Sequence, residues 1–570
     1  MTHSSPPGHA RSTVLEQVLP IAAWLPRYPR NWWQSDITAG LTAAAVVIPQ
    51  AMAYAAIAGL PVQVGLYTAL VPMGIYALFG TSRPLSVSTT STIAILTATA
   101  LEPFVGAPPA ELLGLTSLLA LLTGAFLLLG GILRLGFLAN FISLPVLTGF
   151  KAGIGLVILV SQLPKILGIA GGAGFFGNLA AVATGWPSAH PLTLAVGLGT
   201  IALILGLPRL LPKVPAPVVA VVLTIALSAV AHLETQGVKL VGTIPPGFPT
   251  GAVPPLAEAS SLWPSALGIA LMAVTESISA GRAFTQRGEA EPDANRELRA
   301  LGLANLLGSA FQIIPAGGGT SQTAVNDRAG AKSQMAAIAT AVTVALTLVL
   351  FAPWLSLMPQ ATLGALVLVA AAGLISIEGF RAIGQIRQTE LAWSIAALVG
   401  VVVLGTLKGI LVAIVISLLT LIYQANHPLL YPIGRKPGTD IFRPLNDHPT
   451  DETLPGLLIL RTEGRLTFAS APQVANQMRM FINTNNPPRI VLLDLSAVPD
   501  IEYTALKMLI DAEEKMRQQH GISLWLSRLN PEALRVIRRS SLGKTLGDDR
   551  LFFNIAQAVA HFEMQNNSPT

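Results

Sequence analysis

Two stretches far apart in the chain combine a proline with a run of small hydroxylated residues inside otherwise apolar sequence. The first is RPLSVSTTSTIAIL (83–96) and the second is IIPAGGGTSQTAV (313–325). A helix that starts inside a membrane leaves its first backbone N–H groups unpaired. Lipid offers no acceptors, so such a start must face protein or a wet cavity. Two starts that meet head to head would direct two positive dipole ends at one point and attract an anion.

The residue types in these stretches suit an anion. Gly317–Gly319 would let a ligand approach backbone amides, and Thr89, Thr90, Thr320 and Ser321 could donate hydroxyl hydrogen bonds. The alternative is that the glycines ease helix packing and the hydroxyls bond back to their own backbone. For either stretch alone the two explanations are equally good, and the matched pair favours a binding site.

Polar residues in other apolar segments extend the candidate site. In PQAMAY, Gln50 and Tyr54 lie one turn apart on one helix face, beside the kink expected at Pro49. Glu276 is the lone acid of its segment, and an ionisable residue at membrane depth is a functional-site hypothesis by default. It could carry a proton or contact a sodium ion, or it could be neutral and hydrogen-bonded to a neighbouring helix. Lys151 could snorkel, pair with an acid or line the pathway.

The composition indicates an integral membrane protein. Of 570 residues, 52% are hydrophobic and 11% are charged, and the mean hydropathy is +0.61. A soluble domain has about 25% charged residues. The chain has no cysteine, which excludes disulfides and cysteine-ligated metals. It also has no HExxH, Walker or GxSxG motif, so we expect no enzyme, no metal and no cofactor. Without an ATP-binding motif, transport would be secondary or passive.

The apolar stretches organise the first three quarters of the chain. An N-terminal stretch, 14–34, is predicted to be an interfacial helix or a plain tail, with no cleaved signal peptide before it. Fourteen apolar segments follow, at 37–59, 62–79, 86–101, 112–133, 137–161, 189–207, 215–232, 264–282, 299–312, 320–334, 335–353, 359–376, 389–406 and 409–427. Three of them, 86–101, 299–312 and 320–334, are shorter than the ~20 residues of a full span.

Charge placement predicts the topology. With the N-terminus inside, most of the arginines between the segments fall on the cytoplasmic side, and only Lys165, Lys239 and Lys408 fall outside. Both termini are then cytoplasmic. Fourteen segments divide into two inverted halves of seven, as in secondary transporters, and the two interrupted stretches open the third segment of each half.

These residues resemble a known family. The stretch PQAMAYAAIAGLPVQVGLYTALVPMGIYALFGTSRPLSVSTTSTIAIL (49–96) resembles the signature of the SulP (sulfate permease) anion transporters. So do AVTESISAGRAFTQRG (273–288) and the 293–334 stretch. The resemblance covers essentially the whole chain. It implies fourteen spans in a 7+7 inverted repeat with core and gate domains, and a substrate site between the third and tenth spans, flanked by the first and eighth. The residues it carries over are Gln50, Tyr54, Thr89, Thr90, Glu276, Gly319, Thr320, Ser321 and Gln322.

One position departs from the family pattern. Many sulfate-transporting members carry an arginine after the serine of the tenth span, where this chain has Gln322. The fixed positive charge is absent, which leaves bicarbonate or a dicarboxylate open beside sulfate.

The charged C-terminal part resembles a STAS domain. GLLILRTEGRLTFASAPQVANQM (456–478) predicts strand, turn, strand and helix, and the 489–530 stretch predicts strand, loop, helix and strand. In the loop that is phosphorylated in soluble STAS proteins, Tyr503 and Thr504 replace the usual serine. We expect a regulatory or dimer-supporting role. The predicted domains are 1–35 (cytoplasmic segment), 36–428 (transport domain), 429–438 (linker) and 439–565 (STAS domain).

The sequence thus predicts a secondary active transporter. The cargo would be a small anion, namely sulfate, bicarbonate or a dicarboxylate, taken up with H+ or Na+ by alternating access. The protein would be a homodimer in the bacterial inner membrane, with no nucleic-acid partner. The alternatives are a passive anion channel or an exchanger on the same fold, and a sensor whose membrane part binds an anion.

Overall fold

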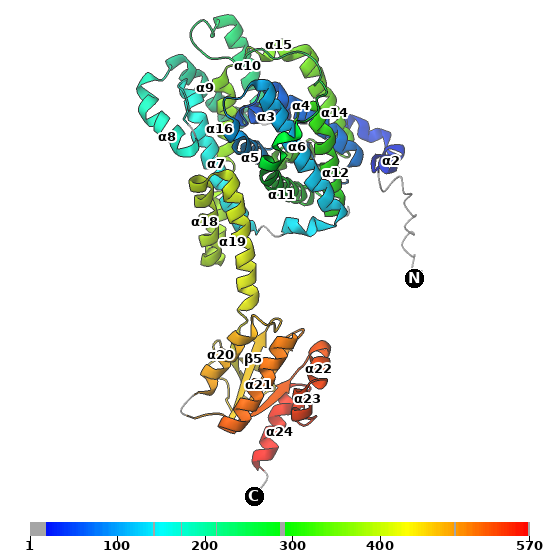
Figure 1. Ribbon diagram of the computed structural model, residues 1–570, viewed down its shortest axis with the longest axis vertical. Coiled ribbons are helices and arrows are strands. Elements are labelled where there is room, and N and C mark those ends of the chain that lie inside the picture. Colours follow the sequence, from blue (N-terminus) through cyan, green and yellow to red (C-terminus); the bar gives the residue numbers. More distant parts are fainter. Residues whose placement is uncertain are drawn as a thin grey trace. The chain divides into compact units, whose positions relative to one another are not determined.

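The computed structural model describes residues 19–140, 143–172, 174–211, 214–285, 291–483 and 486–567. The chain forms two compact units, Met1–Ser417 and Leu418–Thr570. Among the described residues the first unit is helical apart from two very short strands, and the second is built around a sheet (Figure 1).

Every apolar segment predicted from the sequence contains a helix. The main helices of the first unit are α3 (Trp33–Ile57), α4 (Val62–Phe79), α5 (Ser91–Leu101), α6 (Pro109–Ile132), α7 (Leu144–Leu167), α8 (Gly174–Gly185), α9 (Pro191–Leu210), α10 (Ala216–Ala231), α11 (Ala259–Ala283), α12 (Ala294–Gly308), α13 (Thr320–Arg328), α14 (Met335–Leu346), α15 (Ala352–Leu355), α16 (Gln360–Ala372), α17 (Ile377–Ile386), α18 (Gln388–Leu404) and α19 (Thr406–Asn426). Helices α8 and α17 were not predicted. Helix α8 is as apolar as α5 and α9 but is only 12 residues long, whereas α17 carries charges among its apolar residues.

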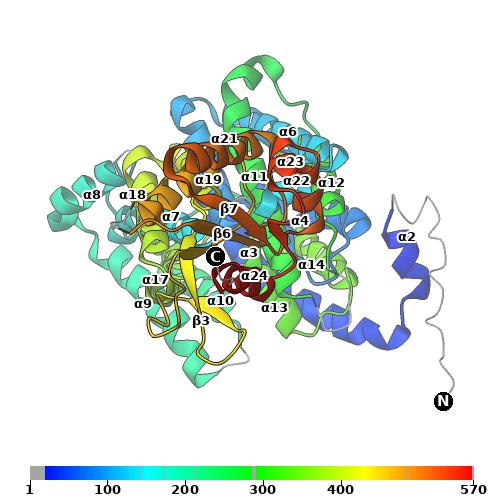
Figure 2. The same cartoon turned by 90° about the horizontal axis from the view of Figure 1, so that it is seen from below.

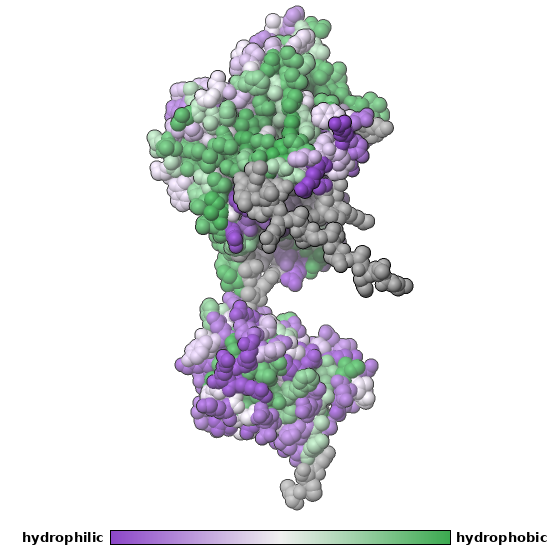
Figure 3. All heavy atoms as spheres, turned by 90° about the vertical axis from the view of Figure 1, so that its right-hand side faces the viewer, coloured by the Kyte–Doolittle hydropathy of each residue, from purple (hydrophilic) through white to green (hydrophobic). Residues whose placement is uncertain are grey.

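Eight of the helices in the described ranges are long and apolar enough to cross a membrane. They lie at Arg30–Ile57, Val62–Phe79, Pro109–Ile132, Leu144–Leu167, Pro191–Leu210, Leu256–Ala283, Met335–Leu355 and Gln360–Ile386. The predicted short segments give helices α5, α12 and α13 of 11, 15 and 9 residues. The surface of the first unit is broadly apolar on the face drawn in Figure 3, as expected for a multi-pass membrane protein.

The helices of the first unit pack as two sets. Helices α3, α4, α5, α6, α11, α12, α13 and α14 pack mainly on one another, and we call them the core set. Helices α7, α9, α10, α16 and α18 likewise pack on one another and form the gate set. Helix α3 of the core set contacts α10 and α16 of the gate set, so α3 lies at the boundary.

The N-terminal stretch differs from the prediction in its described part. Residues 14–18 lie outside the described residues. From residue 21 onward the chain forms a four-residue helix, α2 (Ile21–Trp24), and two 3-10 turns, Leu25–Arg27 and Arg30–Trp32, instead of one continuous helix. Pro26 and Pro29 explain the breaks, since proline lacks the N–H that a continuing helix needs.

The second unit contains a six-stranded mixed sheet of order β4-β3-β5-β6-β7-β8. Its strands are β3 (Leu430–Arg435), β4 (Phe442–Pro444), β5 (Leu457–Glu463), β6 (Ile490–Ala497), β7 (Ser523–Ser527) and β8 (Leu551–Phe552). Strands β5 to β8 are parallel, as predicted, and β3 is antiparallel to its neighbours. The second strand predicted within 456–478 is wrong. That segment makes only an isolated bridge, between Leu466 and Ile501.

Alternate residues of the central strand face two different cores. Val491 and Leu493 of β6 pack in a cluster with α20 (Ala471–Ile482), α21 (Tyr503–His520), α22 (Pro531–Arg538) and α23 (Ser541–Leu546). Ile490 and Leu492 pack in the other cluster, with α24 (Ile555–Asn567). Figure 2 shows α21 to α23 on one side of this sheet and α24 on the other. The two-residue period is that of a strand buried on both faces.

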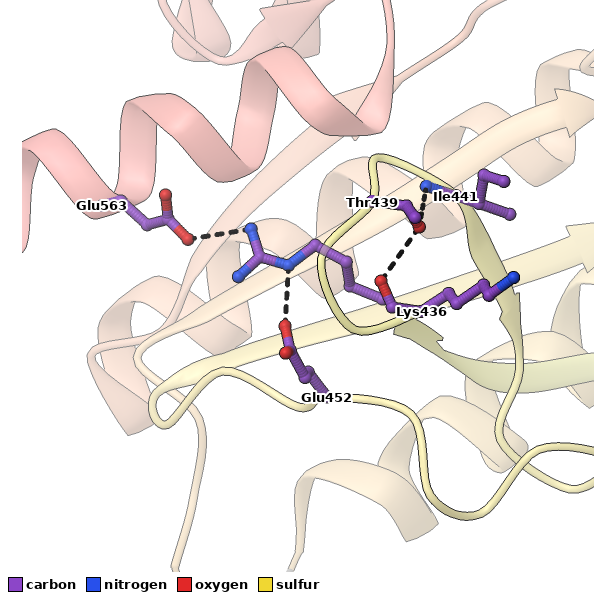
Figure 4. Close-up of polar contacts among 6 residues, drawn as sticks. Lys436, Thr439, Ile441, Glu452 and Glu563 are labelled. Atoms are coloured by element: carbon purple, nitrogen blue, oxygen red, sulfur yellow. Dashed lines mark hydrogen bonds and ion pairs between the residues drawn. The ribbon is translucent and has the colours of Figure 1, made fainter.

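An arginine joins the last helix to strand β3. Arg435 at the end of β3 forms ion pairs with Glu452, at 3.1 Å, and with Glu563 of α24, also at 3.1 Å (Figure 4). In the adjoining turn, Thr439 Oγ1 donates to the Lys436 carbonyl and accepts from the amide of Ile441. These contacts fix α24 against the face that its apolar residues cover.

Candidate functional site

The two interrupted stretches meet as a pair of crossing strands. Strand β1 (Val87–Ser88) pairs antiparallel with β2 (Gly317–Gly318), and each strand leads directly into a short helix. Helix α5 follows β1, and helix α13 follows β2. An antiparallel pair sends the two chains in opposite directions, so both helices begin near the crossing and run away from it. The sequence-based expectation of two half-helices with neighbouring N-termini describes this geometry.

Local chemistry explains why α5 begins where it does. Thr90 has an extended backbone and its Oγ1 accepts a hydrogen bond from the amide of Ile93, 3.2 Å away. This is the N-cap arrangement that threonine favours. The amides of Ser91 and Thr92 have no acceptor within the described part of the chain. The start of α5 therefore presents two free N–H groups.

Helix α13 begins without any side-chain cap. Its N-cap is Gly319, and the amides of Thr320, Ser321 and Gln322 likewise have no protein acceptor among the described residues. Thr320 and Ser321 are exposed, whereas Gln322 is buried. Three more free N–H groups thus belong to this helix end, beside a surface that is accessible.

Two of the three glycine amides in the second stretch already have protein acceptors. The amide of Gly318 donates to Ser277 Oγ at 2.7 Å, and that of Gly319 donates to the Ser86 carbonyl at 3.1 Å, so neither is free for a ligand. A Cβ atom on Gly318 would lie 2.7 Å from Leu85 Cδ1 and 3.0 Å from the Cα of Ser277. Glycine is required there because the crossing strand packs directly on α11.

Glu276 is joined to the start of α5. It lies in α11, is 7% exposed, and accepts hydrogen bonds from Thr90 Oγ1 and Thr92 Oγ1, each at 2.9 Å. One hydroxyl bonds to each carboxyl oxygen. Thr90 therefore serves both the helix cap and the carboxylate. This arrangement is compatible with a charged Glu276 and with a neutral one, because a hydroxyl can donate or accept.

Gln50 and Tyr54 line a cavity between the core and gate sets. The cavity has a volume of about 120 Å³ and is also lined by Ile204, Pro217 and Leu366 of the gate helices. Gln50 and Tyr54 lie in α3, which contacts both α5 and α13. Helix α11 contacts α5 and α13 as well. The four elements that carry the predicted site residues therefore adjoin one another.

Three polar atoms of the predicted residues are buried without a partner in the described structure. They are Gln50 Oε1, Thr89 Oγ1 and Gln322 Oε1. The Nε2 atom of Gln322 lies 3.5 Å from the Thr89 carbonyl, which brings the tip of α13 to the chain just before α5. Buried polar groups are normally satisfied. Two of these exceptions, in Thr89 and Gln322, lie close together, and a polar ligand or water there would satisfy them.

Sequence reasoning missed the side chains that hold the non-helical backbone. Asn305 Nδ2 donates to the Ala316 carbonyl at 2.9 Å, and its Oδ1 accepts from the Ala316 amide at 2.7 Å. Asn326 Nδ2 donates to the Pro84 carbonyl at 3.0 Å, and Gln334 Nε2 donates to the Leu85 carbonyl at 3.2 Å. The only signal in the sequence was the presence of amides in apolar segments.

A second buried acid was also missed. Glu297, 1% exposed in α12, accepts from Tyr76 Oη at 2.6 Å and from the amides of Thr81 and Ser82 at 3.0 and 3.2 Å. Thr81 Oγ1 donates to it as well. These bonds fix the turn that leads from α4 toward β1. Lys151 lies within α7, part-way exposed.

Comparisons with known proteins agree with this architecture. The model of the Sulfate permease family matches residues 33–397, and that of the STAS domain matches residues 448–558. A "Probable sulfate transporter" of Mycobacterium tuberculosis (strain CDC 1551 / Oshkosh) is 35% identical over 553 residues, which cover 95% of this chain and 98% of the relative. A "Probable sulfate transporter 4.2" of Arabidopsis thaliana is 29% identical over 582 residues, with 98% and 85% covered.

A solved structure shares the fold over nearly the whole chain. It is the murine Solute Carrier 26 family member A9 (Slc26a9) anion transporter in the inward-facing state. The two superpose with a TM-score of 0.87 at 22% identity, covering 99% of this chain and 97% of the other.

Proposed function

Since the chain belongs to the sulfate permease family of membrane transporters, we propose that it is a secondary active anion transporter driven by a cation gradient. Its cargo would be sulfate, bicarbonate or a dicarboxylate, and its coupling ion H+ or Na+. The observation that carries the proposal is a set of five backbone N–H groups that have no acceptor among the described residues. They lie at the starts of α5 and α13, next to Glu276.

The charges around this point favour coupled binding. Each helix start contributes about half a positive charge, so the two together roughly balance one ionised carboxylate. With Glu276 charged, an arriving anion finds no net attraction. With Glu276 protonated or paired with sodium, the two dipole ends are left to hold the anion. Binding of the cation would therefore increase the affinity for the anion and vice versa, and symport requires this coupling.

The proposed binding residues follow from the same geometry. Thr89, Thr90, Thr320 and Ser321 would donate hydroxyl or backbone hydrogen bonds at the crossing, which also includes Gly319. Gln322 would contribute its amide. Gln50 and Tyr54 would face the cargo from α3 across the cavity at the core–gate boundary. Movement of the core set past the gate set would then carry the site from one side of the membrane to the other.

Sulfate is the first cargo to test, because the bacterial and plant relatives are named sulfate transporters. Because Gln322 supplies no fixed positive charge, bicarbonate and dicarboxylates remain candidate cargoes and are compared with sulfate. We place the protein in the bacterial inner membrane with both termini in the cytoplasm, as the charge distribution predicts. The proposal also includes a homodimer and four segments of the chain. These are the cytoplasmic segment (1–35), the transport domain (36–428), the linker (429–438) and the STAS domain (439–565).

Uptake into proteoliposomes tests the function. Labelled sulfate, bicarbonate, fumarate and chloride are compared under an imposed proton or sodium gradient, with Glu276→Gln and with Glu378→Gln as control. Glu378 is an exposed acid in α17, so its loss removes the same charge away from the site. We expect Glu276→Gln to abolish gradient-driven accumulation and Glu378→Gln to resemble the unmodified protein.

Two results would overturn parts of the proposal. Flux through Glu276→Gln that is unchanged and insensitive to pH and sodium would refute coupling at this residue and favour a channel or an exchanger. Binding without accumulation of any of the four anions would refute transport and favour a sensor.

A further inference from the structure

A basic pocket lies at the end of the gate helices, away from the helix crossing. Lys165, in the last turn of α7, lines a cavity of about 200 Å³ together with Gln360, Ala56 and Val62. A smaller cavity of about 50 Å³ shares Lys165 and Gln360 and adds Lys239 and Thr193. Among the residues that the structure describes, no carboxylate lines either cavity.

The polar groups of this pocket are fixed in place by backbone contacts. The amide of Gln360 donates to the Lys239 carbonyl at 2.9 Å, and Gln360 Nε2 donates to the Leu240 carbonyl at 3.1 Å. Gln360 is also the first residue of α16, so the positive end of that helix points to the same place. The side chain of Lys165 and the start of α16 thus adjoin both cavities, and Lys239 lines the smaller one.

Lys165 has an incomplete set of partners. Its Nζ donates to the carbonyl of Ala56, in the last turn of α3, at 3.2 Å, and among the described residues it forms no ion pair. An ammonium group has three donors, so two remain for a ligand in the cavity. Because α7 belongs to the gate set and α3 to the core set, this bond also spans the boundary that must open during transport.

We propose that Lys165, Lys239 and Gln360 form an outer capture site for the transported oxyanion, separate from the site at the helix crossing. Lys165 exchanges the Ala56 carbonyl for the anion when the core and gate sets separate at this end. The charge distribution places both lysines on the outer side, where a basic pocket raises the local concentration of anions and their rate of entry. The inference rests on the proposed function, because it concerns the same cargo.

Kinetics in whole cells distinguish capture from a structural role. Lys165→Met and Lys239→Met are compared with Lys408→Met, which removes an exposed lysine predicted to lie on the same side but outside both cavities. Loss of one nearby charge should raise the KM for external sulfate about five- to tenfold with kcat little changed. Lys408→Met should leave KM unchanged, and Lys165→Arg should recover most of the affinity because it keeps the charge.

Chemical protection gives a readout that does not depend on transport. Intact cells that contain the full chain are treated with a membrane-impermeant amine-acylating reagent, with sodium sulfate or with sodium gluconate at equal ionic strength. Acylation is quantified at each lysine by mass spectrometry. We expect sulfate to slow the reaction of Lys165 and Lys239 at least threefold and to leave Lys408 unaffected.

Every outcome of the kinetic and protection experiments either supports or overturns the capture site. Equal protection of the three lysines, or none, overturns the capture site even if the protein transports sulfate. A Lys165→Met variant with lower thermal stability and unchanged KM would mean that Lys165 only caps α3, which also overturns it. Protection in a protein that accumulates no anion would support the site and refute the transport proposal instead.

Discussion

Replacing Thr90 by valine removes one hydroxyl group that makes two different bonds. Thr90 Oγ1 accepts from the amide of Ile93 at 3.2 Å and donates to Glu276 Oε2 at 2.9 Å. Thr92 makes only the second kind of bond, to Glu276 Oε1 at 2.9 Å. Valine has nearly the same shape as threonine, so the two substitutions report mainly on hydrogen bonds. Their comparison separates the helix cap from the carboxylate contact.

The magnitudes follow from the two bonds. Loss of a threonine N-cap costs about 1 kcal/mol. Loss of a hydrogen bond to a charged group costs about 1.5–3 kcal/mol, and to a neutral group about 1 kcal/mol. With Glu276 charged, we expect Thr92→Val to destabilise the protein by about 1.5–3 kcal/mol and Thr90→Val by about 1 kcal/mol more. With Glu276 neutral, Thr92→Val should cost only about 1 kcal/mol.

The assay is the thermal stability of the purified full chain in detergent, with and without sulfate. Thr97→Val is the matched control, because Thr97 is equally buried in α5 but donates only to the Ile93 carbonyl of its own helix. Thr90→Ser keeps both bonds and should be close to unmodified protein. Repeating Thr92→Val in a Glu276→Gln background measures the coupling between the two side chains.

Three results would refute the reasoning. A Thr92→Val variant no more destabilised than Thr97→Val would refute a charged Glu276, because the bond of Thr92 would then contribute no more than a neutral one. A coupling free energy of zero between Thr92→Val and Glu276→Gln would mean that the contact between these two side chains does not contribute to stability. The cap would be unimportant if Thr90→Val and Thr92→Val had equal effects on both stability and sulfate binding.

Two further substitutions test the helix crossing. Gln322→Arg adds a fixed positive charge at the start of α13 and should shift the uptake preference toward sulfate over bicarbonate; an unchanged preference would count against the assignment of this position. Gly318→Ala places a methyl group against Leu85 and the backbone of Ser277, and such overpacking should cost about 1–3 kcal/mol of stability. Thermal melting of the full chain measures this cost, and a melting temperature equal to that of the unmodified protein would show that the strand and α11 are not in such close contact.

The sequence predicted the positions of the interruptions because they are local. A proline with a cluster of hydroxylated residues, joined in the second stretch by three glycines, is not the composition of an ordinary span. Helices α5 and α13 begin within those two stretches. The apolar segments were found for the same reason, since hydropathy is read along the chain. Helix α17 was not predicted, because its charged residues lower its average hydropathy although it lies among apolar helices. The predicted strand around Leu466 failed because a short alternating pattern does not show whether a neighbouring strand is available to pair.

The contacts that hold the site are not local, and the sequence contains no sign of them. Tyr76 and Glu297 are 221 residues apart, and Thr90 and Glu276 are 186 apart. Hydrogen bonds between such distant residues depend on strand register and helix packing, which no single stretch encodes. The same limit applies to the glycine amides. Their partners, Ser277 and Ser86, lie in other segments, so the sequence alone does not show that the amides of Gly318 and Gly319 are occupied.

The distribution of backbone partners separates the parts of the crossing that support the site from the parts that can bind. Non-helical backbone at membrane depth must have partners, and each free group is costly. Side chains of Asn305, Asn326 and Gln334 bond to the backbone of Ala316, Pro84 and Leu85, just before the two strands. In the described part of the chain, the amides of Ser91 and Thr92 in α5 and of Thr320, Ser321 and Gln322 in α13 have no acceptor. Because the chain satisfies one set of groups so thoroughly and leaves the adjacent set open, the open set has the properties of a binding surface, and an anion is the ligand that N–H donors select.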